Sequence, residues 1–268
     1  AMKYAQTIRK LQNQPVAILP DHHRAILETA HEVIAGEYDP KELFEVEPVY
    51  QQVGGVAIIN ICGTILPTCS KLEKMLGAVS CKEIRVAVQR AQQDADIKAV
   101  IFNIESGGGV VQGVPETGEA IKALSAIKPT MTYTGECMAS AAYWLGAQAG
   151  SIIASPSAMI GSIGVYLSVL TMEKSLALEG VEVTILQAGK YKTLGISAKD
   201  LTAEEKEYLQ EGVDKTYADF VAAVSHRGLA TETMQGEVYD AIDAANLKLI
   251  DGTQTDLADI VNHFNAAI

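Results

Sequence analysis

The sequence predicts an α/β fold built on a mainly parallel sheet, and three observations support this. Short runs such as 55–61 and 98–104 are continuously apolar, as strands buried on both faces of a parallel sheet are. Amphipathic helical patterns separate these runs. The composition is globular, with 48% hydrophobic and 20% charged residues. We therefore expect strands and helices to alternate through most of the chain.

The first 50 residues differ from the rest. A helical pattern begins at Pro20-Asp21, continues through His31 and Ile34, and ends before Gly36. The strand pattern begins only at Gly54. We therefore divide the chain into an N-terminal helical extension, 1–50, and a main domain, 51–268.

Within the main domain the elements follow in order. The expected strands are 55–61, 98–104, 130–134, 151–154, 163–169 and 181–187. The expected helices are 81–94, 113–127, 140–149 and 171–179. One long amphipathic helix, 203–226, is stopped by Gly228, and two short helical segments follow at 242–250 and 255–266.

Charge and hydropathy exclude several classes of function. The net charge of −12 disfavours a surface that binds nucleic acid, because phosphate binding needs clustered Lys and Arg. The apolar run around 56–61 is far shorter than the ~18 residues that span a membrane. The N-terminus has no apolar signal-peptide region, so we expect a cytoplasmic protein. The four cysteines form no CxxC pair, so we expect neither a metal nor a redox centre.

Ser140 lies where the apolar pattern 130–134 is followed by small and aromatic residues typical of a helix. A helix N-terminus supplies unpaired N–H groups and the positive end of a dipole. Both suit an attacking hydroxyl whose product is an oxyanion. Because serine also caps helices, its position alone does not decide the role.

A glycine-rich turn, 105–110, follows the predicted strand 98–104. Consecutive glycines let a ligand approach the backbone N–H groups closely. Neither a Walker element nor GxGxxG is present, which disfavours a phosphate loop. Together with Ser140, the turn predicts an oxyanion hole made by the N–H of Gly108 or Gly109 and that of Ala141.

Histidine is one candidate for the base that deprotonates Ser140. None of the histidines follows a predicted core strand, and we expect them on exposed helix surfaces. A Ser-His-Asp triad is defined by geometry and not by order, so it stays an alternative. The five histidines are His22, His23, His31, His226 and His263.

Lysine is the second candidate. Lys192 follows the predicted strand 181–187, and α/β proteins place their sites at the carboxyl ends of strands. A free lysine has a pKa of ~10.4, and burial lowers it enough for a neutral amine to accept a serine proton. Ser162, which lies between Gly161 and Ile163-Gly164, is a candidate to orient that amine.

Four motifs occur in a fixed order: 105–110, 138–143, 161–165 and 189–193. With them the chain resembles the signal peptide peptidase A family of serine proteases over about residues 54–252. The resemblance implies the spiral of β-β-α units that Clp protease and crotonase enzymes share. Two departures are Gly107, where the family has proline, and Ala141-Ala142, where members commonly carry two glycines.

The resemblance also implies roles and partners. Ser140 would be the nucleophile, Lys192 the general base, and Ser162 the hydroxyl that positions the lysine. Substrates would be polypeptides, no cofactor would be needed, and no membrane or nucleic acid would be bound. A homo-oligomeric ring is implied, in which Lys192 completes the site of a neighbouring protomer.

The segment 14–20 and the helix after it resemble phage and prophage members of the family, which act as head-maturation proteases on scaffold and capsid proteins. We therefore expect a capsid or scaffold maturation protease that acts in the host cytoplasm, associated with the procapsid. Three alternatives stay open: a bacterial cytoplasmic peptidase of the same family, an inactive ring-forming scaffold, and a crotonase-like acyl-CoA enzyme. The last would not need Lys192 near Ser140.

Overall fold

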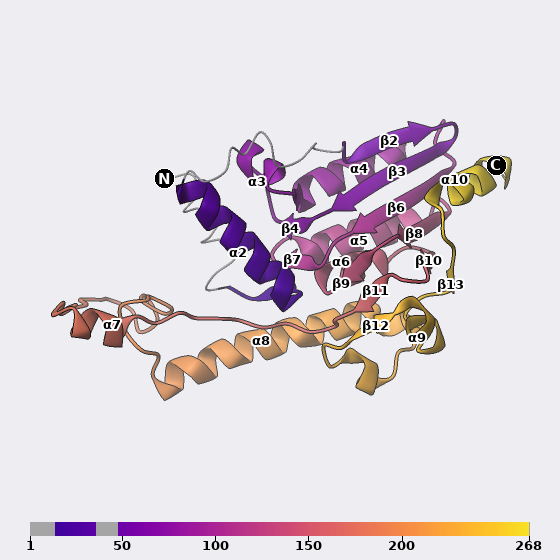
Figure 1. Ribbon diagram of the computed structural model, residues 1–268. Helices are drawn as coiled ribbons and strands as arrows, with labels where there is room; N and C mark the ends of the chain where they lie inside the picture. Colours follow the sequence, from indigo (N-terminus) through magenta and orange to yellow (C-terminus); the bar gives the residue numbers. More distant parts are fainter. Residues whose placement is uncertain (1–13, 36–47, 268) are drawn as a thin grey trace.

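A six-stranded sheet forms the centre of the structure, a computed structural model that describes residues 14–35 and 48–267 (Figure 1). Four apolar strands run parallel through its middle, in the spatial order β10-β8-β6-β3. These are β3 (Val56–Cys62), β6 (Ala99–Glu105), β8 (Thr130–Thr134) and β10 (Ser151–Ala154). At the two edges lie β2 (Tyr50–Val53), antiparallel, and β13 (Gly252–Thr253), parallel. The predicted parallel α/β fold is confirmed.

Most strands of this sheet are followed by a short second strand and then by a helix. β6 leads to β7 (Gly108–Val110) and α5 (Val114–Ser125), and β8 leads to β9 (Cys137–Ala139) and α6 (Ala141–Gly146). β3 leads to β4 (Thr64–Leu66), α3 (Lys71–Met75), β5 (Ala78–Ser80) and α4 (Cys81–Gln93). β10 leads to β11 (Met159–Gly161). This repetition is the expected spiral of β-β-α units.

The short second strands pair with one another in two small sheets. One has the order β1-β7-β4-β5, where β1 (Val16–Ile18) comes from the N-terminal segment and is antiparallel to β7. The other has the order β12-β11-β9, where β12 is Val238–Asp240. Strand-to-helix turns of successive units are thereby brought side by side, and the glycine turn and Ser140 both belong to such turns.

The core lies between the six-stranded sheet and the helices packed on it. Ile59, Phe102 and Tyr143 are fully buried there. Trp144 of α6 stacks on Phe220 of α8 (Ala203–Val224), with 4.6 Å between ring centroids. A buried aromatic pair contributes about 0.5–1.5 kcal/mol beyond its area burial. This contact joins the long helix to the helix that begins after Ser140.

A long arm extends from the body between β11 and α8. Figure 1 shows the chain leaving the sheets, passing through α7 (Glu173–Leu178), and returning along α8. The N-terminal half of α8 projects with the arm, and its C-terminal end reaches the core. At ~1.5 Å per residue, the 22 residues of α8 measure ~33 Å.

The remaining elements complete the two ends of the chain. The helix expected near residue 20 is present as α2 (Pro20–Ala35). After α8 come the 3₁₀ turns η2 (Ser225–Arg227) and η3 (Thr231–Met234), then α9 (Ala241–Asn246) and α10 (Leu257–Ala267). Gly228 has φ of 67° and ends the long helical stretch, as its sequence position predicts.

Two predicted strands are wrong. The run 181–187 forms no strand, and three of its four apolar side chains are exposed: 47% for Val181, 44% for Val183 and 93% for Leu186. The run 163–169 makes only an isolated bridge, between Tyr166 and Val16. Both runs have strand-like composition, but in the arm no neighbouring strand is present to pair with them along their length. A strand needs a partner as well as a pattern.

Candidate functional site

Ser140 lies at a strained turn between β9 and α6. Its φ of 58° and ψ of −123° are unusual for a residue that carries a side chain, and such strain clusters at functional sites. The residue is 1% exposed, and its N–H donates to the Gly161 carbonyl at 2.8 Å. A hydroxyl is thus held in a fixed place at the start of a helix.

Ser162 lies beside Ser140. The strands β9 and β11 are parallel, with Ala139 opposite Gly161. Ser140 directly follows Ala139, and Ser162 directly follows Gly161. Their backbones are therefore about one strand spacing, ~4.8 Å, apart. Ser162 repeats the strained conformation, with φ of 50°, and its N–H donates to the Glu237 carbonyl at 2.6 Å. The structure brings these two predicted site residues together.

The glycine turn meets the nucleophile strand directly. Ser106 forms a parallel bridge with Met138. Its N–H donates to the Cys137 carbonyl at 2.8 Å, and its carbonyl accepts the N–H of Ala139 at 3.1 Å. Three of the four motifs, which are far apart in the sequence, therefore form one continuous site.

The three N–H groups expected to form the oxyanion hole, those of Gly108, Gly109 and Ala141, differ in their hydrogen bonding. That of Gly108 donates to Ser106 Oγ at 3.1 Å. Gly109 lies opposite Ala17 of β1. Successive residues of a strand direct their backbone N–H and carbonyl groups to opposite sides. Val16 forms both of its backbone hydrogen bonds with Tyr166, so the N–H and carbonyl of Ala17 face Gly109 on the other side. Ala141 is the first residue of α6, where an N–H has no acceptor within the helix.

Cys137, on β9, is a second nucleophilic side chain near Ser140 in the sequence. Burial raises the pKa of its thiol to about 11, and the negative charges of Glu105 and Glu136 act in the same direction. The thiol is protonated at neutral pH, and the thiolate is the nucleophilic form of cysteine. The Ser140 hydroxyl, directly after this strand, is therefore the better candidate nucleophile.

Lys192 is not beside Ser140 within one chain. It is an exposed residue of a turn in the arm, and the strand expected to precede it is absent. Its neighbour Tyr191 stacks on Tyr208 of α8, with 4.3 Å between ring centroids. Tyr208 lies ~18 Å along the helix axis from Phe220, the residue that contacts the helix after Ser140. The geometry of a single chain does not form a dyad.

Lys190, the other lysine of this turn, has a different environment. Its ammonium pairs with the Glu204 carboxylate at the start of α8. This contact, with the smaller effect of Tyr191, raises the pKa of Lys190 and so favours its charged form. A general base must be neutral when it accepts a proton, so this upward shift of the pKa makes Lys190 a poorer candidate for a base.

The sequence missed the position of two histidines. Our expectation of exposed histidines is wrong for His23, which is 6% exposed and whose Nδ1 lies 2.6 Å from the Tyr166 hydroxyl. His22 packs directly on the glycine turn, since a Cβ added to Gly107 would lie 1.9 Å from its Nδ1. The first turn of α2 therefore borders the site, and no motif in the sequence indicates this long-range contact.

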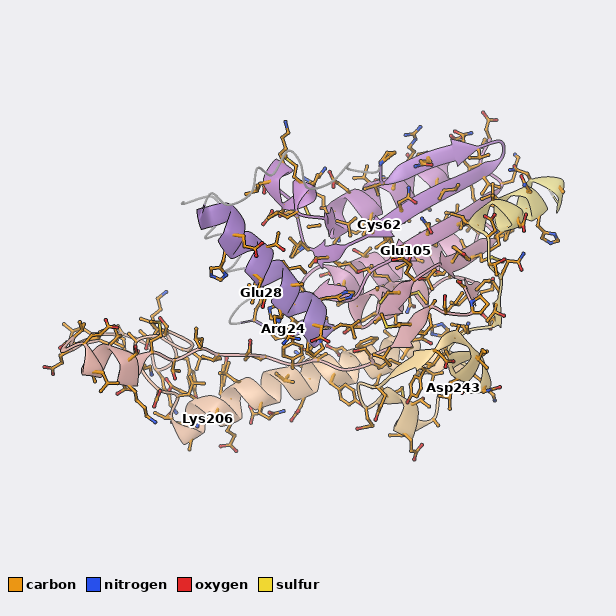
Figure 2. All side chains as sticks on the ribbon, in the orientation of Figure 1. Arg24, Glu28, Cys62, Glu105, Lys206 and Asp243 are labelled. Carbon is orange, nitrogen blue, oxygen red and sulfur yellow. The ribbon has the colours of Figure 1, made fainter. Side chains whose placement is uncertain are left out.

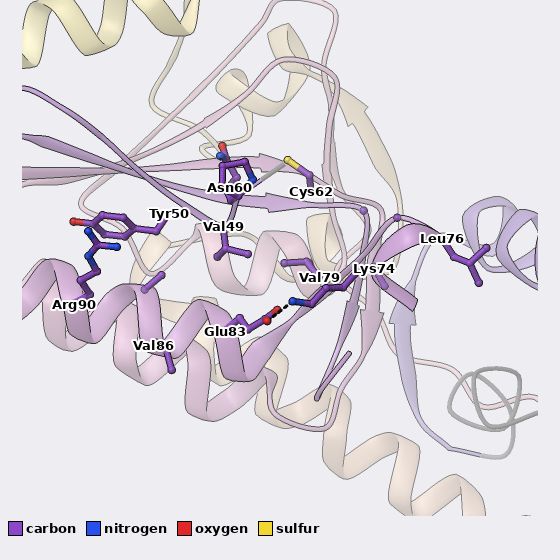
Figure 3. Close-up of a pocket in the computed structure, with 15 residues that line it drawn as sticks. Val49, Tyr50, Asn60, Cys62, Lys74, Leu76, Val79, Glu83, Val86 and Arg90 are labelled. Atoms are coloured by element: carbon purple, nitrogen blue, oxygen red, sulfur yellow. Dashed lines mark hydrogen bonds and ion pairs between the residues drawn. The ribbon is translucent and has the colours of Figure 1, made fainter. Parts of the chain in front are cut away.

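A separate cavity of about 630 Å³ lies between β3 and α4 (Figure 3). Its walls are mostly apolar, with an ion pair between Lys74 and Glu83 and with Arg90 stacked on the ring of Tyr50. None of the predicted site residues lines it. It is distinct from the serine site.

Two further findings concern residues 14–35 and 48–267. No helix in these ranges combines the length and apolar character required to cross a membrane. No group of three or more His, Cys, Asp or Glu side chains there could hold a metal ion.

Comparison with known proteins agrees with the motifs. A family model described as Peptidase family S49 matches residues 122–265. The chain belongs to peptidase family S49. This is the signal peptide peptidase A family of serine peptidases that the four motifs predicted.

Proteins from an archaeon and from phages are among the relatives of this chain. The chain is 34% identical to a putative protease of Methanocaldococcus jannaschii over 62% of this chain and 55% of the relative. It is 27% identical to the head-tail preconnector protein of Enterobacteria phage P21, over 82% of this chain and 43% of that protein. It is 26% identical to the capsid assembly protease C of Escherichia phage lambda, over 75% of this chain and 47% of that protein. The chain thus spans about half the length of these relatives.

Among solved structures, an enoyl-CoA hydratase from Shewanella pealeana resembles the chain with a TM-score of 0.48 and 13% identity. The alignment covers 85% of this chain and 75% of that chain.

Proposed function

We propose that this S49 family member is a serine endopeptidase with Ser140 as the nucleophile. The observation that carries the proposal is the strained turn that holds the Ser140 hydroxyl at a helix N-terminus, beside the glycine turn and Ser162. Buried hydroxyls that only fill a core do not need this conformation. Ala141 supplies one oxyanion N–H in the proposal, and Gly108 or Gly109 supplies the other once the substrate oxygen replaces its present partner, Ser106 or Ala17.

The proposed reaction has two steps. Ser140 Oγ bonds to the substrate carbonyl carbon while its proton passes to the neutral amine of Lys192, and the carbonyl oxygen becomes an oxyanion. The intermediate then expels the amine half of the substrate, which takes the proton from the lysine. Water attacks the remaining ester with the same proton transfers, releasing a carboxylic acid and restoring the Ser140 hydroxyl.

We propose that Lys192 acts in a second copy of the chain. Two observations support this: Lys192 lies far from the Ser140 of its own chain, and the arm exposes large apolar side chains that another protein surface would cover. Among them are Leu170 at 67%, Leu178 at 90% and Leu186 at 93% exposure. Exposed apolar surface of this kind marks protein interfaces. A closed ring would let each arm complete one neighbouring site.

We propose further that the substrates are capsid or scaffold proteins of a phage. Two relatives support this, the head-tail preconnector protein of phage P21 and the capsid assembly protease of phage lambda, as does the resemblance of segment 14–20 and the helix after it to phage members of the family. A peptidase acting outside capsid assembly is the competing outcome, since other S49 relatives come from an archaeon and from bacteria.

The experiment is digestion of a diverse peptide pool by the wild-type chain and by Ser140→Ala, analysed by mass spectrometry. Cleavage by the wild type alone supports the nucleophile and reports the residue preferred before the cut. Equal cleavage by both would contradict the assignment of Ser140. No cleavage by an assembled wild-type chain would favour the inactive scaffold.

A further inference from the structure

Glu105 is labelled in Figure 2. Its carboxylate accepts hydrogen bonds from four donors in one short segment of the chain. Glu105 is the last residue of β6, and the donors lie in residues 134–137, which comprise the two-residue loop between β8 and β9 and the strand residue on each side of it. One oxygen accepts the N–H of Gly135. The other accepts the N–H of Glu136 at 2.9 Å, the N–H of Cys137 at 3.1 Å and the hydroxyl of Thr134 at 3.3 Å.

The residue after Glu105 connects the same region to the glycine turn. The Ser106 hydroxyl donates to the Gly63 carbonyl at 2.6 Å and accepts the N–H of Gly108 at 3.1 Å. Its backbone bonds to Cys137 and Ala139 on β9. Glu105 therefore binds the start of β9 through its carboxylate. Ser106 binds β9 through its backbone and the glycine turn through its hydroxyl.

The geometry points to Glu105 as a positioning residue for the nucleophile, an inference that rests on the proposed function of Ser140. Ser140 is three residues beyond the last amide whose N–H Glu105 accepts, directly after the three-residue strand β9. Charge-assisted hydrogen bonds from backbone N–H groups are stronger than neutral ones, so they restrain the loop firmly. Catalysis is sensitive to displacements of ~1 Å, which makes this restraint a catalytic requirement.

Glutamine is not an equivalent residue at this position. An ionised carboxylate is acceptor-only, whereas an amide presents two N–H donors and a single acceptor oxygen. In Glu105→Gln the NH₂ group of the new side chain would replace one carboxylate oxygen. It would face backbone N–H groups, so donors would meet donors and the hydrogen bonds on that side would be lost. Glu136→Gln is the matched control. It also removes one negative charge, from the loop that Glu105 binds, but the Glu136 side chain is exposed.

Steady-state kinetics on a peptide cleaved by the wild type gives the first test. For Glu105→Gln we expect kcat to fall by about two orders of magnitude, with KM within about threefold, because the scissile carbonyl still binds but the hydroxyl is misplaced. Glu136→Gln should match the wild type within about twofold. Glu105→Asp, which keeps the charge but shortens the reach, should be intermediate. A kcat for Glu105→Gln within about threefold of the wild type, or a loss confined to KM, would overturn the inference.

Amide hydrogen exchange gives a second test that needs no activity. We expect the N–H groups of Ala139 and Ser140 to exchange at least about tenfold faster in Glu105→Gln than in the wild type, and at the wild-type rate in Glu136→Gln. If Glu105→Gln does not fold, Glu105→Asp takes its place. Unchanged protection at both amides would overturn the positioning role. An inactive wild type with the expected exchange would instead reject only the proposed peptidase function.

Discussion

The stacked pair Trp144 and Phe220 gives the most quantitative prediction. Phe220 is fully buried, its ring centroid is 4.6 Å from that of Trp144, and it joins the arm-bearing helix α8 to the helix after Ser140. Removing a buried phenylalanine ring leaves a cavity and costs about 3–5 kcal/mol of unfolding free energy. For a chain of this size, each kcal/mol shifts the melting temperature by about 2–4 °C, so Phe220→Ala should lower it by about 6–20 °C.

Thermal and urea unfolding, followed by circular dichroism at matched protein concentration, measure this effect. The control is Ile242→Ala on α9, where the side chain is 61% exposed and a loss below about 1 kcal/mol is expected. Peptidase activity of Phe220→Ala should also fall at a temperature where the variant is folded, because the helix that carries the arm is no longer fixed to the core. A destabilisation of Phe220→Ala below about 1 kcal/mol would refute the packing argument.

Three further predictions concern the site. Ser162→Ala should lower kcat by at least about tenfold without changing the melting temperature, because only a hydroxyl is removed; an unaltered kcat would remove Ser162 from the mechanism. Cys137, with its pKa raised to about 11, should resist alkylation at pH 8 and react faster as the pH approaches 11; rapid labelling at pH 8 would contradict its burial. Gly109→Ala should disrupt the glycine turn, since a Cβ would lie 1.9 Å from the Ile65 carbonyl oxygen. Gly212→Ala, where nothing lies within 4 Å, should instead stabilise α8 by up to about 1 kcal/mol, and similar melting temperatures for the two would contradict the structure.

The long apolar runs were sufficient to predict the main sheet. The runs beginning near 55, 98 and 130 are strands β3, β6 and β8, since burial on both faces leaves a continuous apolar signal. The second strands were not predicted individually, because β7 and β9 have three residues each and no periodicity can be read from so few. Their existence was implied only by the family resemblance.

The arrangement of the candidate site could be predicted where it depends on local sequence. A serine at a strand-to-helix junction and a glycine turn are short-range signals, and the structure places Ser140, Ser162 and the turn together. The contacts of β1 and His22 with the turn join residues about 90 apart in sequence, and pattern analysis of one chain contains no signal for such pairing. The interpretation of 181–187 as a strand was wrong for a related reason, since the pattern does not show whether a partner strand exists.

The proposal that Lys192 completes the site of another protomer is tested most directly by mixing two inactive variants. Ser140→Ala retains the lysine and Lys192→Ala retains the serine. If sites form between subunits, an equimolar mixture that is dissociated and reassembled should recover about a quarter of wild-type activity, because that fraction of interfaces joins an intact serine to an intact lysine. Each variant alone should be inactive. A mixture that remains inactive while assembling normally would contradict the shared site and require the arm to fold back onto its own chain.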